Sequence, residues 1–174
     1  MEAASHLYLI ALGSNERCRH LGNPQKIVRH ALDALEMPDI DVFVSSPIIP
    51  SHPLGPSRRE YANAAALIVS PLDPPRLLSR LQAVEAHFGR NRRGQKWRAR
   101  TLDIDIILWS GGIWTSSSPP LAIPHPEFHG RGFVLEPAAK IAGTMRDPLT
   151  GLTIRQLHSR FLHPKPLDRR AKPA

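Results

Sequence analysis

The sequence predicts an α+β fold in which helices pack on one side of a mainly antiparallel sheet. Three observations support this class. Four short segments alternate apolar and polar residues, as half-buried strands do. Two segments between them carry apolar residues at helical spacing and begin with a capping residue followed by proline. The order is strand, helix, strand, strand, helix, strand, which is the order of a ferredoxin-like sandwich.

The first three elements lie in the N-terminal part of the chain. A strand is expected over residues 6–12. Asn23 can cap a helix whose first residue is proline, which predicts a helix over 24–37. Alternation resumes over 40–46, where a strand would put three apolar residues on one face: Ile40, Val42 and Val44.

A proline-rich loop and a third strand follow. Residues 47–60 contain four prolines and a glycine. A loop this long in a domain usually contacts a ligand, and a variable surface loop is the alternative. Alternation over 61–69 predicts a strand, in which Asn63 lies between alanines although asparagine is a poor strand former. We therefore expect its amide to hydrogen-bond a ligand or a neighbouring loop.

The second helix is expected over 74–88, capped by Asp73 and closed by Gly89. Gln82 and Glu85 lie beside its apolar stripe. They are either ordinary boundary residues or a half-polar shelf for a flat ligand.

The last strand of the pattern, residues 100–109, carries two aspartates on one face. Its other face is apolar and consists of Leu102, Ile104, Ile106 and Leu108. Asp103 and Asp105 are two residues apart, which on a strand separates them by about 6.6 Å, so their charges repel. A Mg²⁺ ion would remove this repulsion, because it prefers oxygen ligands and is often held by one or two carboxylates plus phosphates. Two solvated aspartates on a wet face are the alternative.

A basic segment leads directly into this strand. Six of the eleven residues over 90–100 are Lys or Arg and none is acidic. Guanidinium groups bind phosphate oxygens in bidentate fashion, while carboxylates hold the metal that bridges other oxygens of the same phosphates. The sequence therefore predicts a metal–polyphosphate site at 90–105.

The remaining sequence is rich in loops. Residues 111–133 contain many Pro, Gly and Ser and few large apolar residues, so they are expected as a second long loop. The two long loops and the basic segment are then the candidates to cover the second face of the sheet. A short helix is expected near 154–161. We expect one domain over 1–162 and a flexible basic tail over 163–174.

Composition narrows the classes of protein. The net charge of +8 favours polyanionic partners. A single cysteine excludes an internal disulfide. The N-terminus does not read as a signal peptide, and no apolar run approaches the length of a membrane span, so a cytoplasmic protein without a membrane partner is expected. A monomer is expected.

With these residues in view, the sequence resembles the 6-hydroxymethyl-7,8-dihydropterin pyrophosphokinases of folate biosynthesis. Six segments carry the resemblance in the right order and spacing. They are Ala11–Asn15, Ser51–Pro56, Glu60–Ala65, Glu85–Arg90, Lys96–Leu108 and Ile123–Pro137. Each is weak alone, but together they cover most of the chain outside the tail.

The resemblance implies a Mg²⁺-dependent transferase that moves pyrophosphate from ATP to the pterin hydroxymethyl group and releases AMP. Two Mg²⁺ ions are expected on Asp103 and Asp105. No nucleophilic side chain is needed, because phosphoryl-type transfer depends on in-line positioning and charge neutralisation. The pterin hydroxyl attacks, activated by Mg²⁺ and Asp105.

The resemblance also implies roles for individual residues. Arg90 and Arg100 are expected to be catalytic together with the two aspartates. The nucleotide would contact Gln82, Glu85, Arg92, Trp97, Arg100, Ile106, His125 and Arg131. The pterin would contact Ser51, Leu54, Gly55, Asn63 and Trp97, with its ring between Tyr61 and Phe133. Trp97 would belong to a loop that closes over both substrates.

Three positions depart from the family pattern: His52, Pro120 and Pro126. We expect them to change affinity rather than activity, because the metal and phosphate groups are intact. A nucleic-acid-binding module is the rival class, but such modules read bases with aromatics, whereas here the central strands carry Asn63 and the aspartates. An inactive homologue is disfavoured by Asp103, Asp105, Arg90 and Arg100.

Overall fold

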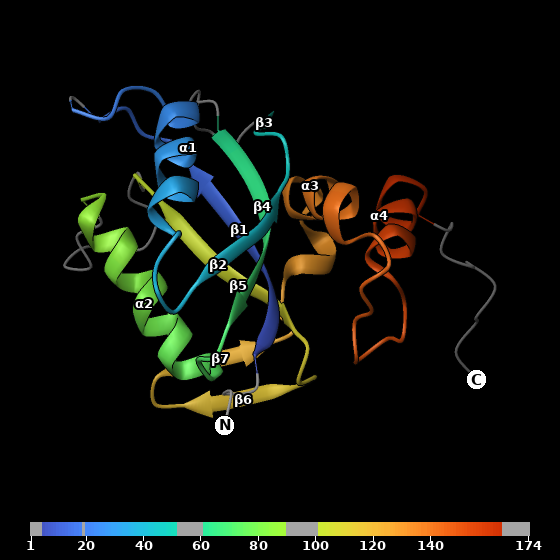
Figure 1. Ribbon diagram of the computed structural model, residues 1–174. Helices are drawn as coiled ribbons and strands as arrows, with labels where there is room; N and C mark the ends of the chain where they lie inside the picture. The colour runs from blue at the N-terminus through green and yellow to red at the C-terminus, as the bar shows by residue number, and fades with distance from the viewer. Residues whose placement is uncertain (1–4, 19, 52–60, 90–100, 165–174) are drawn as a thin grey trace, which may run out of the picture.

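The computed structural model describes residues 5–18, 20–51, 61–89 and 101–164. Its main sheet has the order β2-β4-β1-β5, with β3 also paired to β4, and each of these pairs is antiparallel. The strands are β1 (His6–Ser14), β2 (Asp41–Ser45), β3 (Ile49–Ser51), β4 (Tyr61–Ser70) and β5 (Asp103–Trp109). This order and the two helical crossovers between the strands confirm the α+β, ferredoxin-like class predicted from the sequence (Figure 1).

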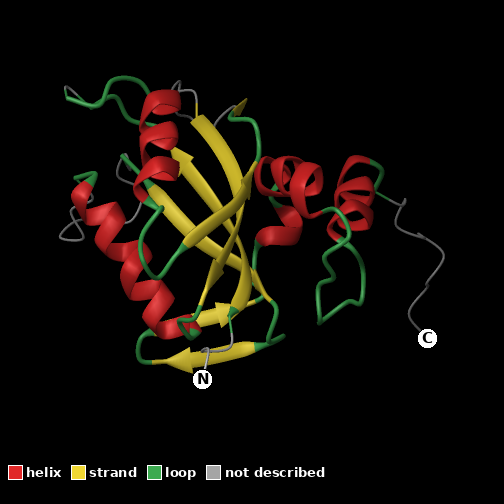
Figure 2. Ribbon diagram, viewed as in Figure 1, coloured by secondary structure: helices red, strands yellow, loops and turns green. Residues whose placement is uncertain are grey.

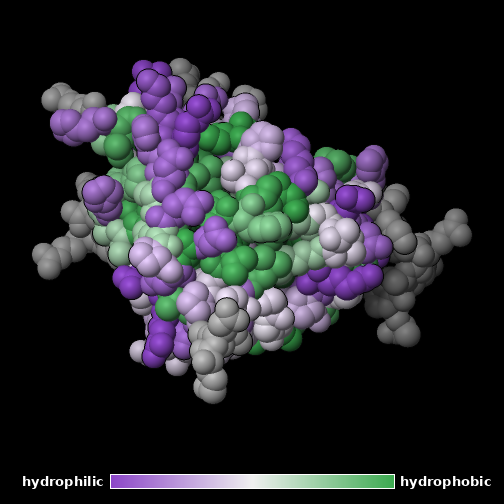
Figure 3. All heavy atoms as spheres, in the orientation of Figure 1, coloured by the Kyte–Doolittle hydropathy of each residue, from purple (hydrophilic) through white to green (hydrophobic). Residues whose placement is uncertain are grey.

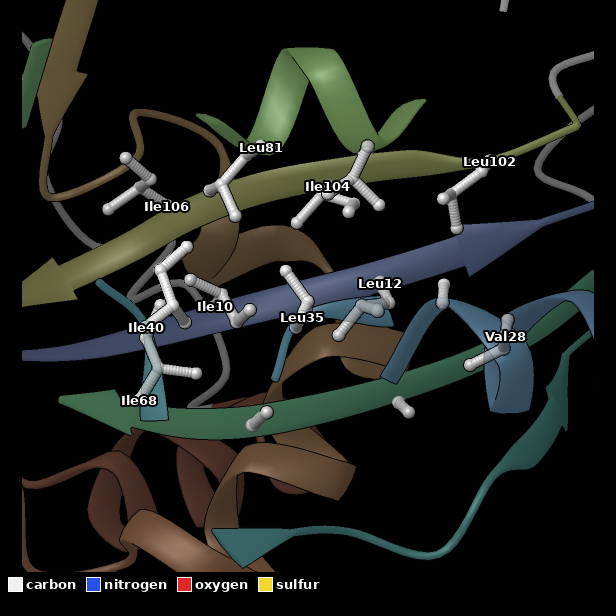
Figure 4. Close-up of a cluster of buried hydrophobic side chains, with 14 of the residues drawn as sticks. Ile10, Leu12, Val28, Leu35, Ile40, Ile68, Leu81, Leu102, Ile104 and Ile106 are labelled. Carbon is white, nitrogen blue, oxygen red and sulfur yellow. The ribbon is translucent and has the colours of Figure 1, made fainter. Parts of the chain in front are cut away.

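Helices α1 (Pro24–Ala34) and α2 (Pro74–His87) cover one face of the sheet, which we call the α1–α2 face. Both begin as predicted: the side chain of Asn23 accepts a hydrogen bond from the Lys26 N–H, and that of Asp73 accepts one from the Arg76 N–H. The apolar residues on this face pack into one core (Figure 4), among them Ile10, Leu12, Val28, Leu35, Ile40, Ile68, Leu81, Leu102, Ile104 and Ile106.

The other face of the sheet is covered differently from the expectation. Helix α3 (Gly132–Ala142) packs on β4 and β1, and α4 (Ile154–Leu162) packs against α3 (Figure 1). Their apolar residues form a second core with the sheet, so helices rather than long loops close much of this face. We call it the α3 face. The loop residues 52–60 and the basic residues 90–100 lie outside the described residues.

Two β-bulges change the face to which some strand residues point, compared with the alternation predicted from the sequence. The pairing of β2 with β4 shifts register between Val42 and Val44. Val42 therefore packs with the α1–α2 core and Val44 with the α3 core, so the prediction that they share a face was wrong. In β5 a similar shift turns Leu108 to the α3 core, whereas Ile106 stays on the α1–α2 face.

The segment predicted as a second long loop is mostly ordered structure. Strands β6 (Trp114–Ser117) and β7 (Pro120–Ile123) form a hairpin at the end of the main sheet where β1 begins (Figure 2). A 3-10 helix, η1 (Phe128–Gly130), then precedes α3. Phe128 is fully buried in the α3 core, so the expectation that this segment contributes little to a core was wrong.

Strand β2 is an edge of the main sheet, and hydrophobic residues gather in the middle of the surface where Figure 1 has β2 and β4 (Figure 3). Phe43, at the bulge of β2, is 71% exposed. A bulge interrupts the regular row of edge hydrogen-bonding groups, which protects an edge strand from pairing with another chain.

Over the described residues, no helix is long and apolar enough to cross a membrane.

Candidate active site

The two aspartates of β5 lie on the α3 face of the sheet, in register with the smallest residues of β1. Asp105 is opposite Ala11 and Asp103 is opposite Gly13. The same two β1 residues are opposite Ala65 and Asn63 of β4. Two rows therefore cross the three central strands, one running Asp105–Ala11–Ala65 and the other Asp103–Gly13–Asn63.

The residues between the polar ones are small, so their side chains project little from the sheet. A Cβ atom added at Gly13 would lie 3.3 Å from Oδ1 of Asn63, so a larger residue there would crowd the amide. Asp103 and Asp105 are partly exposed, whereas Ile104 between them is buried on the α1–α2 face. The rows thus form a polar floor beside an otherwise apolar sheet.

Arg131 brings a positive charge to this floor from the start of α3. Its Nη1 lies 3.3 Å from Oδ2 of Asp105, and its Nη2 donates to Oε2 of Glu127. Nε2 of His125 is 3.8 Å from the same Asp105 oxygen. The Glu127 N–H lies 3.2 Å from Nδ1 of His125 and donates to it, so the ring proton of a neutral His125 is on Nε2, toward Asp105. The structure therefore brings together Asp105, Arg131 and His125, three of the residues named as site candidates from the sequence.

Asn63 and Ser51 meet across β4 and β3. Nδ2 of Asn63 donates to Oγ of Ser51 over 2.7 Å, and Asn63 is 4% exposed. The expectation that this amide makes a specific hydrogen bond is confirmed, here with the neighbouring strand. Tyr61, opposite Ser51, and Phe133, in the first turn of α3, are half-buried.

Gln82, Glu85 and Ile106 lie away from the polar floor. Glu85 is 2% exposed, and its Oε1 accepts the Ile104 N–H over 2.8 Å. Since β5 is an edge of the sheet, Glu85 of α2 reaches the outer edge of this strand. It is buried rather than a boundary residue. Ile106 is buried on the α1–α2 face, and Gln82 of α2 is half-buried.

The other predicted site residues fall outside the described residues. They are Leu54, Gly55, Arg90, Arg92, Trp97 and Arg100. Residue Glu127, in contrast, is part of the site and was missed. Its signal was available, because Glu127 and Arg131 are opposite charges four residues apart.

A pocket of about 540 Å³ opens near Tyr61, at the end of the sheet where α1 begins. Its lining is formed by Asn15, Glu16, Arg17, Asn23, Pro24, Gln25, Pro50, Tyr61 and Ala62. Neither aspartate of β5 borders it. Phosphate chemistry needs charge neutralisation, and the contact of Arg131 with Asp105 lies at the polar floor and not in this pocket.

Paired carboxylates beside an arginine on one face of a sheet are the arrangement expected of a phosphotransfer enzyme that handles metal-bound phosphates. The sequence profile of the 7,8-dihydro-6-hydroxymethylpterin-pyrophosphokinase (HPPK) family matches residues 9–143, most of the chain. The chain belongs to this family.

Relatives with curated names agree. A 2-amino-4-hydroxy-6-hydroxymethyldihydropteridine pyrophosphokinase of Pseudomonas aeruginosa is 39% identical over 141 residues, covering 80% of this chain and 82% of the relative. That of Haemophilus influenzae is 38% identical over 138 residues, covering 78% and 81%. The crystal structure of wild-type Plasmodium falciparum HPPK-DHPS superposes with a TM-score of 0.71 over 92% of this chain and 42% of that one, and its 12% identity supports the fold alone.

The family and the enzyme class predicted from the sequence are therefore confirmed: a pyrophosphokinase of folate biosynthesis, in a family that uses ATP as co-substrate. Neither the nucleic-acid-binding module nor the inactive homologue is favoured by these relatives.

Proposed function

We propose that this chain transfers the pyrophosphoryl group of ATP to the hydroxymethyl group of 6-hydroxymethyl-7,8-dihydropterin at the polar floor of the α3 face. The products are AMP and the pterin diphosphate. The observation that carries this proposal is the contact of Arg131 with Asp105, 3.3 Å, beside a second strand aspartate. A cation next to paired carboxylates is the arrangement that a metal-bound polyphosphate requires.

Mg²⁺ fits the residues at this floor. Asp103 and Asp105 supply oxygen ligands from one strand, and the partly exposed Gly13 beside Asp103 leaves room for further ligands. Two carboxylates per site suit Mg²⁺, which keeps waters and phosphate oxygens in its remaining positions. We propose two ions, held by Asp103 and Asp105. Bound there, Mg²⁺ would neutralise the phosphate charge and acidify the attacking hydroxyl.

On the nucleotide side we propose that Arg131 and His125 bind phosphate oxygens, with Arg90, Arg92 and Arg100 binding others and Trp97 closing over the substrates. The adenine would lie at the outer edge of β5. There Ile104 directs its N–H away from β1 toward Glu85. Ile106, two residues on, directs its own N–H to the same edge. Gln82 and Glu85 would line this edge from α2.

On the pterin side we propose that Asn63 hydrogen-bonds the polar edge of the ring. Its Nδ2 is engaged by Ser51, which fixes the orientation of the amide and aims its Oδ1 toward Gly13. Tyr61 and Phe133 would stack on the two ring faces, and backbone groups of Ser51, Leu54 and Gly55 would contact the ring edge. A flat heteroaromatic is held well by two stacking faces and a few fixed polar groups.

The residues of the chain would act by position and charge. The pterin hydroxyl is the attacking group, and Asp105 can accept its proton. Arg131 and the other arginines hold the polyphosphate in line with that hydroxyl and stabilise the charge that develops on the leaving AMP. No covalent intermediate on the protein is required.

The test is to incubate the protein with ATP, Mg²⁺ and the reduced hydroxymethylpterin and to separate the nucleotides. AMP is expected in equal amount to the pterin diphosphate. Formation of ADP would contradict pyrophosphoryl transfer, and no turnover with tight RNA binding would favour the rival class.

Three further points belong to this proposal. The domain spans 1–162, and the predicted basic tail over 163–174 lies outside the described residues from residue 165 on. The enzyme is a cytoplasmic monomer, and size-exclusion chromatography tests the oligomeric state. Its partners are small molecules, without nucleic acid or membrane.

A further inference from the structure

A buried carboxylate joins the loop between α3 and α4 to the 3-10 helix η1. Asp147 is fully buried, and its Oδ2 lies 3.0 Å from Nε2 of His129. The same oxygen accepts the Thr150 hydroxyl over 2.6 Å, and Oδ1 accepts the Leu149 N–H over 3.0 Å. An ionised carboxylate has no proton to give, so His129 donates through Nε2.

The ionised state of Asp147 agrees with its surroundings. Burial alone would raise its pKa. The hydrogen bonds from Thr150, Leu149 and His129 outweigh burial and hold the pKa of Asp147 below its ordinary value. The backbone around it is also fixed, because the Asp147 N–H donates to the Leu152 carbonyl and the Gly151 N–H donates back to the Asp147 carbonyl. Asp147 is therefore a rigid acceptor.

His129, the partner of Asp147, lies in the segment from His125 to Arg131, whose two end residues are those proposed to bind phosphate oxygens. It follows His125 by four residues and precedes Arg131 by two. Backbone hydrogen bonds run through this segment, from the Phe128 N–H to the His125 carbonyl and from the Arg131 N–H to the Phe128 carbonyl. The His129 ring also lies against the buried Phe128 ring, with centroids 4.1 Å apart. A change in the position of His129 would therefore also shift His125 and Arg131.

A second contact secures the same segment from α4. A Cβ atom added at Gly132 would lie 2.4 Å from the ring of Phe161. The ring of Phe161 therefore lies directly on the backbone between Arg131 and Phe133. Phe161 is 42% exposed, so this contact is not explained by burial in the core alone.

We infer that His129 and Asp147 are positioning residues for the reaction, which anchor the His125–Arg131 segment and so fix Arg131 at its place beside Asp105. This inference rests on the proposed role of Arg131 in binding phosphate. The His129–Asp147 pair touches neither aspartate of β5 in the described contacts, and it acts through Arg131. Geometry at the phosphates matters because a displacement of about 1 Å in a reacting group can cost on the order of a hundredfold in rate.

The experiment compares His129→Ala with Thr150→Val. Both remove one hydrogen bond to the same oxygen of Asp147, but only His129 belongs to the segment that carries Arg131. We expect His129→Ala to raise KM for ATP by about tenfold, as loss of an orienting partner usually does, with a smaller change in KM for the pterin. Thr150→Val should lower Tm to a similar extent and leave the kinetics unchanged. His129→Gln, which keeps an N–H donor near the position of Nε2, should recover most of the ATP affinity.

Arg131→Ala supplies the coupling test. In that background His129→Ala should cause little further change in KM for ATP, because the group that it positions is gone. Full additivity, or equal kinetics of His129→Ala and Thr150→Val at equal loss of Tm, would overturn the inference while leaving the proposed site intact. If Arg131→Ala alone left ATP kinetics unchanged, the phosphate role of Arg131 would fall, and the inference with it.

Discussion

The two faces of the main sheet are made by the same strands, yet they present different chemistry. On the α1–α2 face, β1 contributes Tyr8, Ile10 and Leu12, which are all buried in one core. On the α3 face the same strand contributes Leu9 and Ala11 to the core, and Ala11 and Gly13 lie in the two rows of the polar floor. The α1–α2 face of this strand is apolar core from Tyr8 to Leu12, whereas the α3 face changes from core to polar floor at Ala11.

This difference separates stability from activity. Removal of apolar side chains from water is the main source of folding free energy, and the α1–α2 face supplies it without interruption. Polar groups on the α3 face cost stability, because paired carboxylates repel, and they remain where they can bind charge. Substitutions on the α1–α2 face should therefore lower stability with little effect on activity, and substitutions at the polar floor should lower activity with little effect on stability.

The largest effect is expected for Asp105→Ala on the α3 face. The variant loses a proposed metal ligand and the partner of Arg131, so kcat/KM should fall by about 10³-fold or more. Its Tm should change little, because removal of one of two repelling charges offsets the loss of the partly exposed contact with Arg131. Steady-state kinetics and a thermal melt measure the two quantities. Asp41→Ala, which removes an exposed aspartate from β2, is the control. Normal turnover by Asp105→Ala would refute the metal assignment.

Leu81→Ala tests the α1–α2 face. Leu81 of α2 is fully buried among the apolar residues of the sheet (Figure 4). We expect its free energy of unfolding to fall by roughly 2–5 kcal/mol, the usual cost of a cavity in a core. The folded fraction should keep its kcat/KM. Urea unfolding measures the first quantity, and Phe43→Ala, at a 71% exposed position, should change little. A large loss of turnover at unchanged stability would break the comparison.

Asn63→Ala lies at the boundary between core and floor. Loss of the amide should raise KM for the pterin by roughly tenfold, through loss of a hydrogen bond to a substrate held in a fixed geometry. KM for ATP should be nearly unchanged. Ser51→Ala removes the same Asn63–Ser51 hydrogen bond but keeps the amide and the backbone of Ser51. Equal kinetic effects of the two variants would mean that Asn63 acts only by holding β3 in place.

The comparison of the two faces also explains how much of the fold the sequence predicts. The α1–α2 face follows from local patterns, since helix caps and alternation need no distant partner. The bulges opposite Ile68 and Leu9 depend on how two strands pair, so alternation placed Val44 and Leu108 on the wrong face. Helix α3 was missed because Pro137 lies inside it and a Gly/Pro-rich segment precedes it.

The site was predictable in a different way. Two features point to a function from the sequence alone. One is the repulsion between Asp103 and Asp105 on one strand face, and the other is Asn63, an asparagine inside a strand. Nothing local indicates that Arg131 lies beside Asp105, 26 residues earlier, and this expectation came from the resemblance to a family. Glu127 was missed although its partner, Arg131, is an opposite charge only four residues further along the chain. The His129–Asp147 pair joins residues 18 apart and was likewise invisible in the pattern.

The smallest effect is expected for Asn23→Ala, and it sharpens the comparison at the edge of the site. Asn23 caps α1 through its contact with the Lys26 N–H, so its loss should reduce the free energy of unfolding by about 1 kcal/mol, and Asn23→Ser should restore most of it. If the reacting groups lie at the polar floor, kcat and both KM values should be unchanged. Asn23 also borders the 540 Å³ pocket near Tyr61. A change in KM for the pterin that Asn23→Ser fails to reverse would therefore mean that this pocket takes part in binding, and that the α1–α2 face serves more than stability.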